Sequence, residues 1–191
     1  MIRSLPFKLK LKIMSLHWQS YPELCVRPPA KLMPWLLDAN SFMQRLRQHE
    51  VNGAEVRVLA QQWQFPNRSE QSLLALPPRQ YGLVREVVIS SVKAKWMFAR
   101  TVFPRATLTG KEQMLARLKN RALGTMLFNH VNVTRGPFEF ALIKPGDAWH
   151  QKITLAAQRN EPQLWARRSV FSINHKTLLL CEVFFPDLME L

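Results

Sequence analysis

Cysteine, histidine and glycine are scarce in this sequence, and each scarcity argues against a class of site. The chain has 191 residues, of which 2 are cysteine, 5 are histidine and 6 are glycine. Cys25 and Cys181 have no paired spacing, so we expect no disulfide framework and a reducing, cytoplasmic setting. The histidines show no pairing at metal-ligand spacing, and no glycine-rich phosphate loop or nucleophile elbow occurs. A metal site is therefore not expected.

Long hydrophobic runs and acidic residues are also few. No apolar stretch reaches the roughly 20 residues that a transmembrane helix needs. The 27 Lys and Arg residues against 13 Asp and Glu give a net charge of +14. This charge suits a nucleic acid, an anionic membrane surface or an anionic substrate as the partner, or it reflects only a basic surface. Composition alone does not choose among these.

The basic excess begins at the N-terminus. Residues 1–22 contain four basic residues and no acid, and apolar residues alternate with the lysines. They lack the continuous apolar segment of a secretory signal. We predict that residues 1–30, which end just after Pro28-Pro29, form a basic N-terminal arm that is frayed or contacts a membrane surface. Residues 31–191 have a length typical of one domain.

Hydrophobic patterning predicts about six strands and three helical segments. The strands are expected at 55–64, 82–90, 96–103, 131–143, 164–173 and 177–185, and the helices at 34–39, 41–49 and 107–128. The second and third strands form one hairpin, and the last two form another. Because the connections are too short or not helical enough for repeated βαβ crossovers, we expect an α+β fold with a single antiparallel sheet flanked by helices. The connections 66–78 and 144–162 are polar and have no assigned shape.

A single carboxylate interrupts the most apolar segment of the chain. Glu182 lies among the otherwise apolar residues 178–185. A strand this apolar is normally buried, and a buried carboxylate is costly unless it is paired or protonated. We therefore interpret Glu182 as a general acid or base, or as the hydrogen-bond partner of a ligand hydroxyl.

Arginine occupies the middle of three other apolar segments, at Arg85, at Arg100 and at the pair Arg167–Arg168. Several inward arginines around one buried acid favour a pocket for a small, doubly anionic molecule. The simpler interpretation of Arg85 or Arg100 alone is a cross-strand ion pair on a half-exposed sheet. For Arg167 and Arg168 the simpler interpretation is a solvated strand end.

Several segments, taken in order, resemble the chorismate pyruvate-lyase family. They are residues 35–37 (WLL), Ser41 with Arg45, 84–86 (VRE), 99–104 (ARTVFP), 123–124 with 127–128 (LG and LF), 165–169 (WARRS) and 178–186 (LLLCEVFFP). The resemblance extends from about Trp35 to Pro186, and the ordered set is more specific than any single segment. The sequence departs from the family pattern in a longer segment at 144–162 and in Phe42, which replaces a smaller or more flexible side chain.

The resemblance implies an enzyme that converts chorismate into 4-hydroxybenzoate and pyruvate for ubiquinone biosynthesis, without a metal or an organic cofactor. The family's ligand is buried on an antiparallel sheet beneath two helical flaps. By matched position, Arg85 binds the ring carboxylate, assisted by the backbone amides of Phe42 and Leu123, one in each flap. Glu182 faces the hydroxyl at the opposite end of the ring, so Arg85 and Glu182 are the predicted catalytic residues. Arg100 is our candidate for the second carboxylate, on the enolpyruvyl group.

Two other functions compete with this interpretation. The same fold serves as a non-catalytic small-molecule effector-binding module in some bacterial transcription regulators, where a DNA-binding domain precedes it. Only about thirty residues precede the resemblance here. A nucleic-acid binder would account for the positive charge, and it predicts steep salt dependence without a need for Glu182. The retained Arg85–Glu182 pair favours the enzyme, which we expect to act on chorismate as a cytoplasmic monomer, without nucleic acid.

Overall fold

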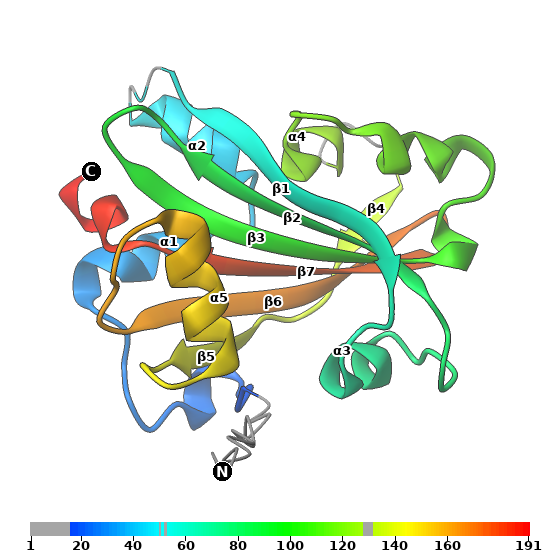
Figure 1. Ribbon diagram of the computed structural model, residues 1–191, viewed down its shortest axis with the longest axis horizontal. Helices are drawn as coiled ribbons and strands as arrows, with labels where there is room; N and C mark the ends of the chain where they lie inside the picture. Colours follow the sequence, from blue (N-terminus) through cyan, green and yellow to red (C-terminus); the bar gives the residue numbers. More distant parts are fainter. Residues whose placement is uncertain (1–15, 50, 52, 128–131) are drawn as a thin grey trace, which may run out of the picture.

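A single antiparallel sheet forms the centre of the molecule. The computed structural model describes residues 16–49, 51, 53–127 and 132–191. The strands in this part of the chain are β1 (Glu55–Gln64), β2 (Gly82–Ser90), β3 (Lys95–Pro104), β4 (Val133–Arg135), β5 (Glu139–Ile143), β6 (Leu164–Ile173) and β7 (Lys176–Phe184). They form one seven-stranded sheet in the order β1-β2-β3-β7-β6-β4, with β5 also paired to β6 (Figure 1). The predicted α+β class and single antiparallel sheet are confirmed.

The predicted count of about six strands becomes seven because the extended segment 131–143 forms two of them. β4 pairs with residues 171–173 of β6, and β5 pairs with residues 164–168 of the same strand. Gly136 and Pro137 separate the two strands, and proline cannot donate a hydrogen bond to a ladder. Residue 131 itself lies outside the described residues.

The two predicted hairpins lie next to each other in the middle of the sheet. β2 pairs with β3 and β6 pairs with β7, while the pairing of β3 with β7 joins the hairpins. The turn between β6 and β7 consists of Asn174 and His175, whose positive φ angles of 47° and 65° suit a type I′ turn. Nearly every residue of β2, β3 and β7 is buried, so other elements cover both faces of these strands.

Different helices cover the two faces of the sheet. The α-helices are α1 (Met33–Leu37), α2 (Phe42–Gln48), α3 (Arg68–Leu73), α4 (Leu123–Leu127) and α5 (Ala148–Ala157). On one side, called the cavity face below, α1, α2 and α4 share a core with Ala99 and Leu180. On the reverse face, α5 packs with Phe98 and Val183 and lies across β6, while residues next to α3 pack on Val102 (Figure 1).

The predicted helices at 34–39 and 41–49 are confirmed as α1 and α2, and Ser41 takes the N-cap position of α2. The predicted helical segment 107–128 is broken into short 3₁₀ helices followed by α4. The 3₁₀ helices of the described chain are η1 (Tyr21–Glu23), η2 (Ala30–Leu32), η3 (Arg105–Thr107), η4 (Gly110–Arg117) and η5 (Pro186–Glu190).

Both connections without an assigned shape contain a helix. α5 lies within 144–162, and α3 lies within 66–78. At the start of α3, the Asn67 side chain accepts a hydrogen bond from the Glu70 amide, and the Glu70 carboxylate accepts one from the Asn67 amide. This capping box is visible in the sequence, since Glu70 follows Asn67 at the required spacing.

The part of the predicted N-terminal arm that the structure describes, residues 16–30, packs on the sheet. Gln19 and Phe140 exchange two backbone hydrogen bonds of 3.0 and 2.8 Å, and Leu24 belongs to the core. Residues 1–15, which hold four of the five Lys and Arg residues of the arm, lie outside the described residues. Within the described part, no helix has the length and apolar character needed to cross a membrane.

Candidate active site

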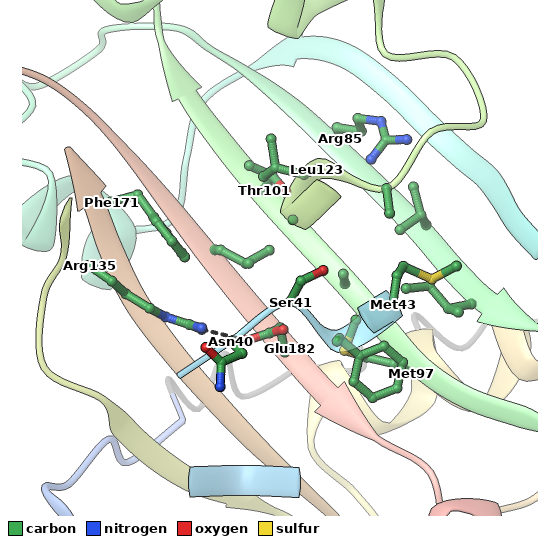
Figure 2. A pocket seen from close by; sticks show the side chains of 17 residues that line it. Asn40, Ser41, Met43, Arg85, Met97, Thr101, Leu123, Arg135, Phe171 and Glu182 are labelled. Atoms are coloured by element: carbon green, nitrogen blue, oxygen red, sulfur yellow. Dashed lines mark hydrogen bonds and ion pairs between the residues drawn. The ribbon is translucent and has the colours of Figure 1, made fainter. Parts of the chain in front are cut away.

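A small cavity lies between the cavity face of the sheet and the two helices α2 and α4. Its volume is about 40 Å³. Most of the side chains that line it are apolar (Figure 2). The polar lining residues are Asn40, Ser41, Arg85, Thr101, Arg135 and Glu182. Of the five predicted site residues, the structure brings Arg85, Phe42, Leu123 and Glu182 to this cavity, but not Arg100.

Arg85 occupies one end of the cavity as a cation that has no acidic partner among the described residues. Its side chain projects from β2 and is only 2% exposed. Nη2 donates to the carbonyl oxygens of Lys119 and Arg121, at 2.8 and 3.0 Å, while Nε is buried without a hydrogen-bond partner. Burial lowers the pKa of Arg85 to about 10, and no neighbouring carboxylate offsets this effect. A buried cation without a counter-ion is costly, so this end of the cavity favours an anion.

Glu182 occupies the other end, where it forms ion pairs with Arg135 (Figure 2) and with Arg167. Oε2 accepts hydrogen bonds from Arg135 Nη2 at 2.8 Å and from Arg167 Nε at 2.7 Å, and Oε1 accepts one from Arg167 Nη2 at 3.2 Å. Burial alone would raise the pKa of Glu182, but the charges and hydrogen bonds of Arg167 and Arg135 outweigh it and lower this pKa below its ordinary value. Glu182 is therefore ionised at neutral pH.

Arg167 fixes the position of Glu182 from behind. It lies directly opposite Glu182 in the β6–β7 register and is 1% exposed. Its Nη1 donates to the carbonyl oxygens of Trp35, Leu36 and Asp38, at the C-terminal end of α1. A cation at this position satisfies carbonyls that the helix leaves without partners. The interpretation of Arg167 as part of a solvated strand end is therefore wrong.

Arg135 is a cavity residue that we did not predict. Its guanidinium lies over the rings of Phe138 and Phe171, at 4.3 and 4.7 Å from the ring centroids. Nε donates to Ser169 Oγ at 2.8 Å, and Nη1 donates to the Ala39 carbonyl at 3.2 Å. Burial lowers the pKa of Arg135 to about 10 although the charge of Glu182 raises it. An arginine just before the Gly136-Pro137 break, inside an otherwise extended segment, was the available signal in the sequence.

The two predicted flaps correspond to α2 and α4, which contact each other over the cavity. Phe42 and Leu123 are the first residues of these helices. The amide groups of the first helical turn have no partner within a helix, so they are free to bind another acceptor. Ser41, immediately before α2, lines the cavity with a buried hydroxyl that has no hydrogen-bond partner among the described residues.

Arg100 lies on the reverse face of the sheet, which corrects its predicted role. Arg85 stands opposite Thr101 in the β2–β3 register, whereas Arg100 stands opposite Glu86, and successive residues of a strand point to opposite faces. Arg100 Nη1 donates to Glu86 at 2.6 Å, and its Nε and Nη2 donate to Glu70 at 2.6 and 3.0 Å. Burial would lower the pKa of Arg100, but Glu70 and then Glu86 outweigh it and raise this pKa. Arg100 therefore has its own acidic partners and is not placed to bind a ligand in the cavity.

The molecule is an α+β domain in which two helices and one antiparallel sheet enclose a cavity lined by two arginines and one carboxylate among the described residues. Solved structures agree with the fold. The effector domain of PhnF from Mycobacterium smegmatis matches with a TM-score of 0.55 and 11% identity, over 79% of this chain and 91% of that one. A PhnF C-terminal domain matches with a TM-score of 0.58 and 10% identity, over 78% and 89%. At this identity the likeness shows the fold alone.

Sequence comparisons are more specific. The family model described as chorismate lyase matches residues 13–190. A probable chorismate pyruvate-lyase from Aromatoleum aromaticum is 37% identical over 167 residues, which cover 86% of this chain and 90% of the relative. Another, from Pseudomonas aeruginosa, is 34% identical over 159 residues, which cover 83% and 85%. The chain therefore belongs to the chorismate lyase family, and the resemblance seen in its sequence is confirmed.

Proposed function

We propose that this protein converts chorismate into 4-hydroxybenzoate and pyruvate, with Arg85 and Glu182 at the two ends of the ring. One observation carries the assignment of residues. The cavity has an unpaired buried arginine at one end and an arginine-stabilised carboxylate at the other. The ring carboxylate of chorismate and its C4 hydroxyl are para to each other, so a single orientation satisfies both ends. Charge-assisted hydrogen bonds contribute about 1.5–3 kcal/mol each, which suits binding through Arg85.

The reaction requires two bonds to break, on the neighbouring ring carbons C3 and C4. The C3–O bond of the enolpyruvyl ether breaks, and its electron pair leaves on oxygen as the enolate of pyruvate. The C4 hydrogen leaves as a proton, its bonding pair completes the aromatic ring, and a proton on the enolate carbon gives pyruvate. Because aromatisation drives the change, the protein mainly has to orient the side chain and stabilise the departing negative charge.

Glu182 has one acceptor position left for a ligand hydroxyl. An ionised carboxylate accepts about four hydrogen bonds, and arginines donate three here. An efficient general base has a pKa near the operating pH, whereas the pKa of Glu182 is lowered. This supports a role in which Glu182 accepts a hydrogen bond from the C4 hydroxyl and holds the ring, while the proton moves within the substrate.

Movement of the flaps accompanies binding in this proposal. Pockets for small molecules measure about 300–1,000 Å³, whereas this cavity measures about 40 Å³. Since α2 and α4 form the wall opposite the sheet, they are the elements that must separate to admit a ring with two substituents. Backbone amides of Phe42 and Leu123 would then meet the ligand at the starts of both helices.

The direct test is turnover of chorismate by the purified protein. In buffer with a chelator and no added metal, we expect 4-hydroxybenzoate, followed by its ultraviolet absorbance, and pyruvate in equal amounts. Boiled protein supplies the blank. A flat absorbance trace at micromolar protein would reject the proposal. Binding of chorismate without turnover would instead support a non-catalytic effector-binding module.

The setting of the enzyme is also part of the proposal. Cys25 and Cys181 are both free thiols, which suits a reducing compartment such as the cytoplasm. We further propose a monomer that needs no nucleic acid, and contact between the basic residues of the arm and a membrane surface. Co-sedimentation with anionic vesicles at low and high salt tests the membrane contact.

A further inference from the structure

Chorismate carries a second carboxylate whose position on the ring restricts which residue can bind it. This inference rests on the proposed function. The enolpyruvyl group is on C3, next to the C4 hydroxyl and away from the ring carboxylate. If Glu182 holds the hydroxyl, the group that binds the enolpyruvyl carboxylate must stand beside Glu182.

Arg135 is the lining cation that stands there. Its Nη2 lies 2.8 Å from Glu182 Oε2, and Figure 2 shows this pair at the end of the cavity away from Arg85. A guanidinium has five N–H donors, and Arg135 uses three, toward Ser169, Ala39 and Glu182. The two that remain, one on each Nη, match the number that a carboxylate accepts in a two-point contact.

The other arginines of the region already donate to other groups or lie at the far end of the cavity. Arg167 directs its Nε and Nη2 to Glu182 and its Nη1 to three carbonyls of the α1 end, and it does not line the cavity. Arg100 is on the reverse face with Glu70 and Glu86. Arg85 is at the far end, where the ring carboxylate binds. Among the described lining residues, Arg135 is therefore the cation available to the second carboxylate.

We propose that Arg135 binds the carboxylate of the enolpyruvyl group and thereby distinguishes the dianionic substrate from the monoanionic product. The contact also places a positive charge beside the oxygen that receives electrons when the C3–O bond breaks. The rings of Phe138 and Phe171 and the Ser169 hydroxyl hold the guanidinium in place before the ligand arrives. 4-Hydroxybenzoate has no group at C3, so its affinity should depend little on Arg135.

The test compares two ligands in the wild type and in Arg135→Gln and Arg135→Lys. The ligands are 4-hydroxybenzoate, with one carboxylate, and 3-(1-carboxyvinyloxy)benzoate, a dianion that cannot aromatise further. Titration calorimetry should show a loss of about 10- to 100-fold for the dianion in Arg135→Gln. The change for 4-hydroxybenzoate should stay below about threefold. Arg135→Lys keeps the charge beside Glu182 and should recover part of the dianion affinity.

Kinetics give an independent readout. Both variants should raise KM for chorismate more than they raise the inhibition constant of 4-hydroxybenzoate. Ser169→Ala is the matched control, because it removes one support of Arg135 and leaves the charge, so its effect on the dianion should be smaller. Equal losses for both ligands, or none for either, would overturn the role of Arg135. If Arg135→Gln does not fold, the same comparison with Arg135→Lys decides. Absence of turnover in the wild type would instead reject the proposed function.

Discussion

The two faces of the sheet each bury a cluster of charged residues, and the clusters differ in their balance. On the reverse face, the buried Arg100 pairs with the buried carboxylates of Glu70 and Glu86, and the exposed Lys152 also pairs with Glu86. The positive and negative charges there are equal in number. This cluster is complete without any ligand and ties α3 and α5 to the sheet.

On the cavity face, Arg135 and Arg167 pair with the carboxylate of Glu182, and Arg85 lies at the opposite end of the cavity without an acidic partner among the described residues. The arginines outnumber the carboxylate by two, which is the charge that a dianion would neutralise. Each cluster contains a buried arginine, Arg100 on the reverse face and Arg85 on the cavity face, so the burial of an arginine does not by itself separate them. In the proposed function, the cluster with excess positive charge is the binding site, while the cluster whose charges are equal in number has a structural role.

The largest effect should follow from breaking the balanced cluster. Arg100→Met removes the arginine that pairs with the buried carboxylates of Glu70 and Glu86. We therefore expect the free energy of unfolding to fall by about 3–5 kcal/mol. KM for chorismate should change little at temperatures where the variant is folded. Urea unfolding measures the first quantity, and initial rates measure the second.

The double variant with Arg100→Met and Glu70→Gln is the control for this prediction. A neutral amide at position 70 removes one unpaired charge and should recover part of the lost stability. An Arg100→Met protein with normal stability but a tenfold higher KM would reverse the assignment of the two clusters.

The next effect concerns the unbalanced cluster. Arg85→Ala should lower the affinity for chorismate and for 4-hydroxybenzoate by roughly 100- to 1,000-fold, since two charge-assisted hydrogen bonds are lost. The free energy of unfolding should not fall in parallel, because Arg85 has no acidic partner and its burial is costly. Calorimetric titration and urea unfolding of one preparation check both. If Arg85→Ala kept full affinity for 4-hydroxybenzoate, another residue would have to bind the ring carboxylate.

The smallest effect should come from Glu182. Glu182→Gln keeps the shape and an acceptor oxygen but removes the charge, so kcat should fall by about 10- to 100-fold. KM should not rise, because one more uncompensated positive charge then faces the anionic substrate. A fall of about 10,000-fold would indicate that Glu182 transfers the proton.

The pH profile sharpens the same prediction. The folded pKa of Glu182 is lowered from the ordinary 4.5. A lowered pKa means that the stabilisation from its ion pairs is fully present above pH 4.5 and is lost as the pH falls through the folded value. We therefore expect that titration of Glu182 causes no loss of kcat between about pH 7 and pH 5. A fall of kcat toward low pH in this range that is absent in Glu182→Gln would contradict an ionised Glu182.

Local signals in the sequence predicted most of the fold. Apolar segments separated by short polar turns located both hairpins, and the break at Gly136-Pro137 was visible, although it divides one extended segment into two strands. The helix α3 was missed despite its Asn67–Glu70 capping box, because the surrounding prolines suggested an irregular connection. The single carboxylate in an apolar strand pointed to Glu182, and the family resemblance supplied Arg85 as its counterpart.

The strands and the order of the hairpins were predictable from the sequence alone because they rest on local pattern, and the proposed pair of Arg85 and Glu182 came from one carboxylate in an apolar strand and from matched segments. Only the tertiary structure decided which buried arginines belong to the cavity. Arg100 and Arg85 look alike in sequence, and the register of β2 against β3 sends them to opposite faces. Arg135 and Arg167 reach Glu182 because β4, β6 and β7 lie close together in the sheet. Register and strand order follow from the packing of the whole sheet, which a single strand does not encode.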